Sequence, residues 1–269
     1  MSKVLIGVNV LESVNSHVYA NHVKFFTNLK LNHPEDQFVF FTPYRMAIDS
    51  MRNAAAKLAI EHKCDYLMFI DDDVMIKPQT YKMLKDADRD CIMALTYIRG
   101  YPFAPMFFKS FRQLVDNTGA TAEYLTTYDD YEEHIPEDGI VPCAAVGFSC
   151  VLIKMDLILA VAPPWFLTGP NHTEDVYFCN KARYTLDPEP TICCHTRIAT
   201  QHIMMADAVT DFNVKKLREL YAPDKPLGKS REERIQDSIK FLSEPSIPVE
   251  TPVLEDYNVN EYNGVEVHD

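Results

Sequence analysis

The chain has 269 residues, of which 47% are hydrophobic and 24% charged, a composition typical of a soluble globular protein. Its net charge of −13 argues against broad adhesion to nucleic acid or to an anionic membrane, although a local basic groove remains compatible with it. No apolar run approaches the roughly 20 residues of a membrane helix, the N-terminus lacks a signal-peptide pattern, and the seven cysteines include no CxxC pair. We therefore expect a cytoplasmic protein with reduced thiols.

Apolar runs typical of strands alternate with segments of helical spacing. Buried strands are expected at residues 3–10, 37–41, 66–70, 91–98, 144–153 and 191–203. Helices are expected at residues 17–31, 43–59, 78–87, 154–162 and 173–185. Thr42 and Pro43 mark the start of the second helix, because threonine caps helices and proline suits the first helical position. This alternation predicts an α/β fold with a mixed, mainly parallel central sheet and helices on both faces.

The C-terminal part differs in composition from the rest. Residues 241–269 contain seven acidic residues, several prolines and no Lys or Arg, and they show no apolar periodicity. We expect two parts: a globular domain over residues 1–220, and an acidic, proline-containing C-terminal extension over residues 221–269.

Three consecutive aspartates, Asp71 to Asp73, directly follow the apolar strand at residues 66–70. In an open parallel sheet, ligands bind beyond the carboxyl ends of the strands. Side chains two residues apart in an extended chain point the same way, so we expect Asp71 and Asp73 to share one target. No basic residue lies beside them before Lys77. The pair therefore predicts a Mg²⁺ or Mn²⁺ site that also binds phosphate oxygens.

Other interpretations of the aspartates differ in how well they fit. An EF-hand does not fit, because Ile76 and Lys82 stand where the loop requires Gly and Glu. A phosphohydrolase with Asp71 as nucleophile and Asp73 as acid/base remains open, although no downstream paired-aspartate motif with a suitable Lys follows. An acidic turn that caps the next helix also remains open.

Four stretches in order resemble the GT-A glycosyltransferases, in particular the family 2-like group of bacteria and bacteriophages. They are "SMRNAAAKLAIEHKCDYLMFIDDDV", "CIMALTYIRGYPFAPMFF", "VGFSCVLIKMDLI…PPWF" and "TEDVYFCNKA…TRIATQHI". The resemblance covers about residues 3–205 and implies a GT-A (Rossmann-like) fold over the domain. It also implies metal-dependent transfer of a sugar from a nucleotide-sugar, foremost a UDP-sugar, to a hydroxyl group.

The resemblance also implies roles for the acidic residues and one late histidine. It places Asp71 and Asp72 beside the nucleotide-sugar, and it assigns Asp71, Asp73 and His202 to a Mn²⁺ or Mg²⁺ ion. A histidine satisfied at a strand end is the alternative for His202. His195 fits the metal position less well.

Glu174 and Asp175 follow Thr173, at the start of an expected helix. Thr173 suits the N-cap, and the helix dipole stabilises carboxylates in the first turn, so helix capping alone explains these residues. The resemblance implies that Asp175 is the general base for the acceptor hydroxyl and Glu174 its neighbour or an acceptor ligand. In a retaining enzyme the same carboxylates would orient the substrates.

Further residues are expected on the donor side of the site. Val8 and Asn9, at the end of the first strand, border the nucleotide by topology. The resemblance places Arg52 near the nucleotide base or phosphate, with Arg45 as a second candidate, and surface salt bridges are the alternative for both.

Gly147 and Trp165 are candidates for contacts with a sugar. A glycine within a strand indicates a close backbone approach, which a sugar pocket at Gly147 would explain. Trp165, the only tryptophan, is expected either to anchor the core or to stack on an acceptor.

The sequence leaves the acceptor open. Hydroxymethylated pyrimidine in phage DNA is one candidate, which would place the protein in the host cytoplasm, and a polysaccharide, a lipid or a small molecule are others. A phosphate track for DNA is expected from Lys109, Arg112, Lys215, Lys216 and Arg218. A non-catalytic nucleotide-sugar binder is the remaining class.

Overall fold

The computed structural model describes residues 1–10, 13–115, 121–127, 135–169, 172–203, 208–209 and 214–221. The chain divides into two units, Met1–Ala222 and Pro223–Asp269, and all the described residues belong to the first. The expected acidic extension therefore lies outside the described residues, apart from Tyr221.

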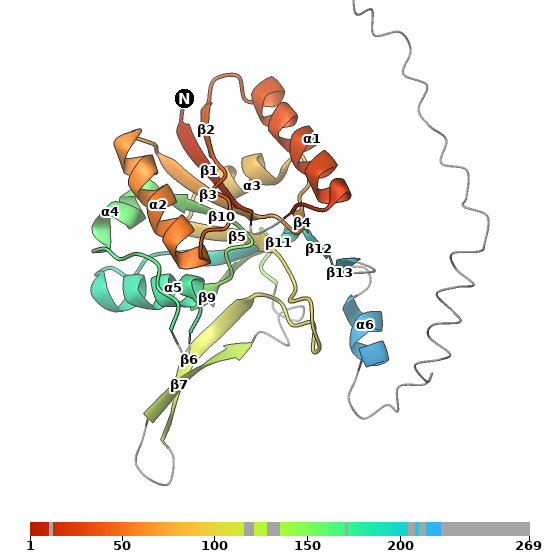
Figure 1. Ribbon diagram of the computed structural model, residues 1–269. Helices are drawn as coiled ribbons and strands as arrows, with labels where there is room; N and C mark the ends of the chain where they lie inside the picture. Colours follow the sequence, from red (N-terminus) through yellow and green to blue (C-terminus); the bar gives the residue numbers. More distant parts are fainter. Residues whose placement is uncertain are drawn as a thin grey trace, which may run out of the picture. The chain divides into compact units, whose positions relative to one another are not determined.

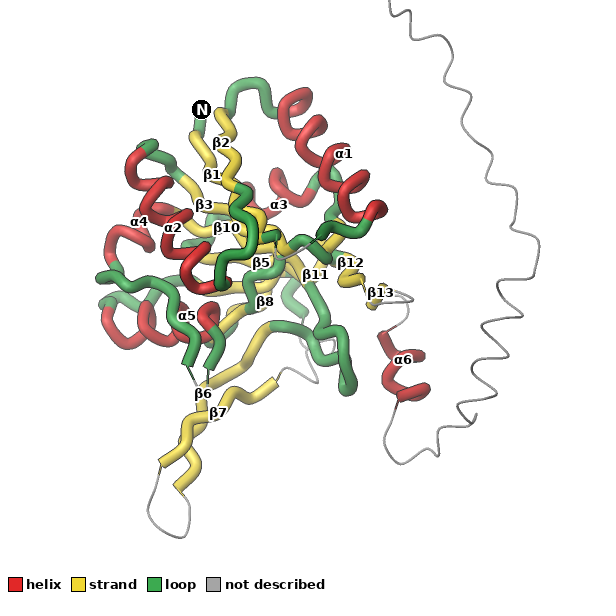
Figure 2. Tube along the Cα trace, viewed as in Figure 1, coloured by secondary structure: helices red, strands yellow, loops and turns green. Residues whose placement is uncertain are grey.

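A seven-stranded sheet forms the centre of the first unit, with the strand order β2-β1-β3-β10-β5-β11-β8 (Figures 1 and 2). Its strands are β1 (Lys3–Asn9), β2 (Gln37–Phe41), β3 (Tyr66–Asp71), β5 (Cys91–Leu95), β8 (Ile140–Pro142), β10 (Cys150–Lys154) and β11 (Ile192–Ala199). Strands β2, β1, β3, β5 and β11 run parallel to one another, whereas β10 and β8 run antiparallel to their neighbours. The expected α/β class, with a mixed and mainly parallel central sheet, is confirmed.

The central strands are apolar throughout because both faces of the sheet are covered. In β3, Leu67 and Phe69 belong to the core on one face, whereas Met68 and Ile70 belong to the core on the other. Each of these side chains is almost completely buried, which contributes about 1.5–3 kcal/mol per large side chain. Alternation of this kind explains why these strands appear in the sequence as continuous apolar runs.

Helices cover both faces of the sheet, as expected. Helices α1 (Ser16–Asn32) and α3 (Thr80–Asp86) pack on the face of Met68. Helices α2 (Ile48–Glu61), α4 (Met155–Ala160) and α5 (Glu174–Thr185) pack on the face of Phe69 (Figure 1). Helices α2 and α5 both begin near the carboxyl ends of the parallel strands.

The second helix begins five residues later than the sequence predicts. It starts at Ile48, not at Pro43, because Tyr44 forms a parallel bridge with Val10 and prolongs the pairing of β2 with β1. The N–H of Arg45 then donates to the carbonyl of Val10 at 3.0 Å, with φ of 53° at Arg45. A left-handed residue at this point cannot belong to a right-handed helix, so the predicted start was wrong.

Two predicted strands are each divided in the structure. Residues 144–153 form β9 (Ala145–Val146) and β10, separated at Gly147, whose N–H donates to the carbonyl of Met106 at 2.7 Å. Residues 191–203 form β11 and β12 (Gln201–Ile203). Strand β12 leaves the central sheet and pairs with β4 (Val74–Met75) and β13 (Ala208–Val209). This change of sheet sets His202 opposite Val74, directly after the aspartates.

A long hairpin, which the sequence did not predict, extends away from the central sheet. It consists of β6 (Phe107–Val115) and β7 (Thr121–Thr127) (Figure 2). The start of β6 pairs with β9. The last described helix is α6 (Val214–Tyr221). Of the described residues, no helix combines the length and the apolar character needed to cross a membrane.

Candidate functional site

A cavity of about 320 Å³ opens at the carboxyl ends of β1 and β3. It is lined by Asn9, Ile48, Arg52, Asp71, Asp72, Asp73, Met106, Phe148, Ser149, Thr173, Glu174 and Asp175. The lining contains five carboxylates against one guanidinium group, so the field within the cavity attracts cations. All five acidic residues expected at the site therefore share one cavity.

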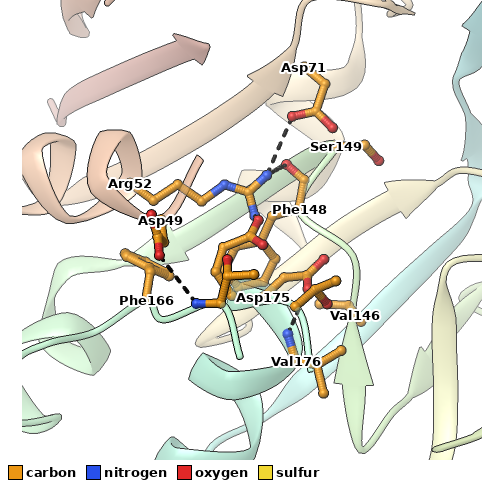
Figure 3. A network of polar contacts seen from close by, with 12 residues as sticks. Asp49, Arg52, Asp71, Val146, Phe148, Ser149, Phe166, Asp175 and Val176 are labelled. Atoms are coloured by element: carbon orange, nitrogen blue, oxygen red, sulfur yellow. Dashed lines mark hydrogen bonds and ion pairs between the residues drawn. The ribbon is translucent and has the colours of Figure 1, made fainter. Parts of the chain in front are cut away.

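The three aspartates do not lie in an extended segment. Asp71 is the last residue of β3, and the chain turns at Asp72 and Asp73 before β4 begins. Asp71 Oδ1 lies 3.4 Å from Arg52 Nη2 (Figure 3), whereas Asp73 faces other residues. The backbone is therefore not extended through Asp73 as expected, but Asp71 and Asp73 both line the cavity.

Asp73 and His202 come from distant parts of the chain and lie together. His202 Nε2 is 3.3 Å from Asp73 Oδ1, and His202 Nδ1 is 2.8 Å from the carbonyl oxygen of Tyr97. A carbonyl only accepts hydrogen bonds, so Nδ1 carries the hydrogen and the Nε2 atom is directed at the carboxylate. This orientation is usual for histidines that bind metals through Nε2.

Two positively polarised groups surround the carboxylate of Asp73. Besides His202, Arg99 Nη1 lies 2.7 Å from Asp73 Oδ2. Burial on its own would raise the pKa of Asp73, but the hydrogen bond from His202 and the charge of Arg99 lower it. Asp73 is therefore ionised at neutral pH and can act as a ligand.

The ligand types of Asp71, Asp73 and His202 suit a divalent metal ion, although their ligand atoms do not all lie within 4.8 Å of one another. Asp71 and Asp73 supply hard carboxylate oxygens, and His202 supplies an imidazole nitrogen that a carbonyl already orients. Within the described residues, the one group of three ligand atoms within 4.8 Å of one another is instead His33, Glu35 and Asp36.

That second group is a structural ion pair. Both oxygens of Asp36 already accept hydrogen bonds, from the N–H of Ser2 and from the side chains of Tyr81 and Lys85. A metal ion would have to replace all three donors, so the metal candidate remains the group at the aspartates.

Arg52 lies between Asp71 and Glu174 in the cavity. Its Nη1 is 2.6 Å from Glu174 Oε1, and its guanidinium carbon lies 5.2 Å from the ring centroids of both Phe69 and Phe148. Figure 3 shows the guanidinium directed at Asp71. Because the residue is 2% exposed and already paired, its expected contact with a nucleotide stays a prediction.

Burial changes the acidity of the two carboxyl groups that Arg52 bridges. It raises the pKa of Asp71 to about 6, although the charge of Arg52 opposes the change. Burial also raises the pKa of Glu174, again against the effect of Arg52. Both groups therefore gain from an additional positive charge in the cavity.

The start of α5 presents Asp175 to the cavity. Thr173 stands at the N-cap, but its hydroxyl donates to Asp175 Oδ1 and accepts no hydrogen bond from a backbone N–H of the first turn. The N–H of Val176 also donates to Asp175 Oδ1, at 2.8 Å (Figure 3). Of the described residues, none bonds to Oδ2 of Asp175, so this oxygen can accept a hydrogen bond from a ligand.

The other residues expected near the nucleotide lie in different surroundings. Asn9 lines the cavity, and its buried Oδ1 has no hydrogen-bond partner among the described residues. Val8 is 3% exposed and belongs to the core, not to the lining. Arg45 is exposed, lies over the ring of Tyr44 and is also not part of the lining. Of these three residues, only Asn9 lines the cavity.

Gly147 and Trp165 are both explained by packing within the protein. A Cβ atom at Gly147 would lie 2.7 Å from Met106 Cε, so the close neighbour there is Met106, which itself lines the cavity. Trp165 is 8% exposed, and its Nε1 donates to the carbonyls of Ile158 and Val161 at 2.8 and 2.9 Å. Stacking of Trp165 on an acceptor was therefore the wrong alternative, because the indole anchors the core.

The basic residues expected to form a phosphate track for DNA have different surroundings in the structure. Lys109, Lys215 and Lys216 are exposed, whereas Arg218 donates to the carbonyls of Pro102 and Phe103, both at 2.9 Å. The side chain of Arg112 lies outside the description.

Sequence reasoning missed several residues of the site. Arg99 pairs with Asp73, and the carbonyl of Tyr97 bonds to His202. Met106 and Ser149 line the cavity. Their only signal in the sequence was their position in or near the quoted GT-A-like stretches.

No protein-family model matches the chain, and no curated protein matches it. The crystal structure of A197 from STIV superposes with a TM-score of 0.51 at 17% identity, over 85% of this chain and 98% of that chain. This likeness shows a shared fold.

Two further crystal structures superpose with TM-scores below 0.5. That of GalNAc-T7 with UDP, GalNAc and Mn²⁺ gives 0.42 at 11% identity, over 90% of this chain and 48% of that chain. That of 4-diphosphocytidyl-2C-methyl-D-erythritol synthase from Anaerococcus prevotii gives 0.40 at 6% identity, over 81% of this chain and 97% of that chain.

Proposed function

We propose that the protein is a metal-dependent glycosyltransferase that moves a sugar from a nucleotide-sugar, foremost a UDP-sugar, to a hydroxyl acceptor. The observation that carries the proposal is the placement of His202 against Asp73, whose carboxylate lines an acidic cavity together with Asp175. The sequence resemblance to GT-A glycosyltransferases supports the same conclusion.

The charge of the cavity favours a cation together with a diphosphate. Five lining carboxylates would repel a diphosphate by itself, so a divalent ion on Asp71, Asp73 and His202 would offset that repulsion. When bound, Mn²⁺ or Mg²⁺ supplies Lewis-acid stabilisation of the charge on the departing diphosphate. Asn9 Oδ1 is positioned to accept a hydrogen bond from the nucleoside, since no described group satisfies it.

The acceptor side assigns different tasks to the two acidic residues of α5. Glu174 pairs with Arg52, so its carboxylate is occupied, whereas Asp175 keeps Oδ2 for a ligand. In an inverting reaction, Asp175 takes the proton of the acceptor hydroxyl as its oxygen bonds to the anomeric carbon. The bond from that carbon to the diphosphate breaks, and its electrons leave with the phosphate. In a retaining reaction, the same carboxylates orient the acceptor.

For the acceptor we propose to test hydroxymethylated pyrimidine in DNA first, against polysaccharide, lipid and small-molecule hydroxyl compounds. The exposed Lys109, Lys215 and Lys216 support a phosphate contact, and the net charge of −13 opposes it. Transfer of labelled sugar to each acceptor class distinguishes them.

The donor reaction is tested by hydrolysis of a panel of nucleotide-sugars with Mn²⁺ and with EDTA. Asp73→Asn should abolish metal-dependent turnover, and Asp175→Asn should lower transfer by about 10²–10⁴-fold, the usual contribution of a general base. Asp156→Asn, on the exposed side of α4, removes the same charge and should leave turnover intact. Unchanged turnover in Asp73→Asn would refute the proposal.

Two further classes make opposite predictions. A phosphohydrolase would cleave simple phosphate esters and would need Asp71 as a free nucleophile, whereas Asp71 pairs with Arg52. A non-catalytic binder would hold the nucleotide-sugar equally well in the Asp175→Asn variant, without any transfer in the wild type.

A further inference from the structure

Two arginines of the described residues pair with the aspartates of the site, and their surroundings differ. The side chain of Arg52 is 3% exposed and packs between two aromatic rings, so it is fixed. The side chain of Arg99 is 55% exposed and pairs with Asp73 at 2.7 Å. Ion pairs exposed to this degree are weak and exchange readily with solvent ions.

Arg99 holds the oxygen of Asp73 that His202 leaves uncovered. His202 Nε2 faces Oδ1, and Arg99 Nη1 faces Oδ2, so both oxygens are occupied. The carbonyl of Tyr97 already orients the histidine, so its ring need not move to serve as a ligand once Nε2 has given up the hydrogen that it directs at Asp73. The guanidinium is therefore the group that a cation entering beside Asp73 has to displace.

The backbone that carries Arg99 is anchored on both sides of the residue. Tyr97 forms a bridge with Pro105, and the N–H of Ile98 donates to the carbonyl of Ala104 at 3.0 Å. Arg218 of α6 also donates to the carbonyls of Pro102 and Phe103, both at 2.9 Å. A displaced Arg99 side chain thus remains tethered close to Asp73.

We infer that Arg99 is a resident counterion of Asp73 which a divalent metal displaces, and that the released guanidinium then binds the diphosphate of the ligand. A guanidinium pairs with phosphate oxygens through two parallel hydrogen bonds, which a single carboxylate oxygen does not allow. The exchange makes metal binding and diphosphate binding cooperate, because the metal frees a cation for the anion. The second half of this inference rests on the proposed function; the displacement does not.

The test measures Mn²⁺ binding to the full chain directly, from the electron paramagnetic resonance signal of free Mn²⁺ at fixed ionic strength. Without nucleotide, Arg99→Gln should bind Mn²⁺ about two- to fivefold more tightly than the wild type, since no counterion competes. Arg183→Gln is the matched control, because it breaks the pair with Glu189 in the last turn of α5 and changes the net charge equally.

A second measurement uses inorganic pyrophosphate, UDP and uridine at saturating Mn²⁺. Arg99→Gln should bind pyrophosphate and UDP about tenfold more weakly than the wild type, with its affinity for uridine unchanged. The affinity of Arg99→Lys for pyrophosphate and UDP should lie between those of Arg99→Gln and the wild type, since lysine keeps the charge without the planar fork. The exchange predicts that Arg99→Gln raises the affinity for Mn²⁺ and lowers the affinity for the diphosphate. A loss for pyrophosphate identifies the diphosphate as the ligand, and a loss for UDP alone would point to the nucleoside and overturn this half.

The displacement is overturned if Arg99→Gln binds Mn²⁺ no more tightly than Arg183→Gln, or if neither it nor the wild type binds Mn²⁺. Turnover of a nucleotide-sugar without any change in Mn²⁺ affinity would reject the exchange and keep the proposed function. The reverse result, opposite shifts without turnover, would keep the exchange and reject the transferase.

Discussion

Arg52 Nη1 lies 2.6 Å from Glu174 Oε1, and the same guanidinium reaches Asp71 Oδ1 through Nη2 at 3.4 Å. One buried cation thus joins α2, the end of β3 and the start of α5. Two neighbouring residues of α2 support the same region: Asn53 bonds to the backbone of Trp165 and Phe166, and Asp49 accepts from the N–H of Thr168. Helix α2 therefore fixes the segment that leads to the acidic residues of α5.

Removal of the Arg52 charge should destabilise the protein severely. Arg52→Met leaves Glu174 buried without a counterion, which costs about 3–5 kcal/mol of unfolding free energy in urea titrations followed by circular dichroism. Adding Glu174→Gln should recover part of that loss, because the uncompensated charge disappears. Arg183→Met breaks a pair whose acidic partner is 59% exposed, and it should cost less than about 1 kcal/mol. Equal losses for the two arginines would contradict the bridging role.

Asp36 should stabilise the fold in a pH-dependent way. Although its burial opposes the shift, hydrogen bonds from Lys85, Tyr81 and Ser2 lower the pKa of Asp36. The stabilisation is therefore present above the unfolded value of about 3.9 and is lost as the pH falls through the lowered folded value. Asp36→Asn should cost about 2–3 kcal/mol at pH 7.

The control for Asp36 is its exposed neighbour. Glu35→Gln should change stability by less than about 0.5 kcal/mol, since the Glu35 side chain is 56% exposed. Thermal melts from pH 3 to pH 7 should show the Asp36→Asn deficit shrinking toward the acidic end. A deficit that stays constant over this range would mean that the charge of Asp36 contributes nothing.

The single tryptophan reports on the core and not on the ligand. Trp165 is 8% exposed and uses its indole N–H within the protein, so its emission should be blue-shifted and resist iodide quenching. Addition of Mn²⁺ and nucleotide-sugar should leave that emission almost unchanged, with N-acetyltryptophanamide as the solvent-exposed reference. Trp165→Phe should cost about 1–3 kcal/mol in stability while donor affinity is kept. Strong quenching by the donor would restore the stacking interpretation.

The sequence predicted the sheet well because burial on both faces leaves a strong local pattern. Phe69 and Met68 face opposite cores, and this alternation of covered faces appears as an unbroken apolar run. The predicted start of α2 was wrong because the positive φ of Arg45 depends on a bond to Val10 in another strand. Propensity at Pro43 could not reveal a tertiary contact of this kind.

The site was predicted in its carboxylates but not in its cations. Asp71, Asp73 and Asp175 follow strand ends or begin helices, and these positions are visible in the sequence. The partner of Asp73, in contrast, depends on where the segment after β5 places Arg99, which no local pattern encodes. The pairing of Arg52 with Glu174 joins two elements in the same way. The two members of each ion pair are far apart in the sequence, so only the three-dimensional structure identifies them.

The metal-free protein should lose stability between pH 4 and pH 7 because of Asp71. Burial raises the pKa of Asp71 to about 6, against about 3.9 in the unfolded chain, so its stabilising contribution is complete below pH 3.9 and is lost as the pH rises through 6. Asn at this position cannot ionise. In EDTA, Asp71→Asn should therefore gain about 1–2 kcal/mol over the wild type across this range, a value reduced because the Asp71 side chain is 29% exposed. Saturating Mn²⁺ should stabilise the wild type more than Asp71→Asn and reverse the difference at pH 7. The control is Asp156→Asn, which is exposed on α4 and should follow the wild type in both conditions. If the stability difference between the wild type and Asp71→Asn is the same at pH 4 and at pH 7, Asp71 ionises freely in the folded protein.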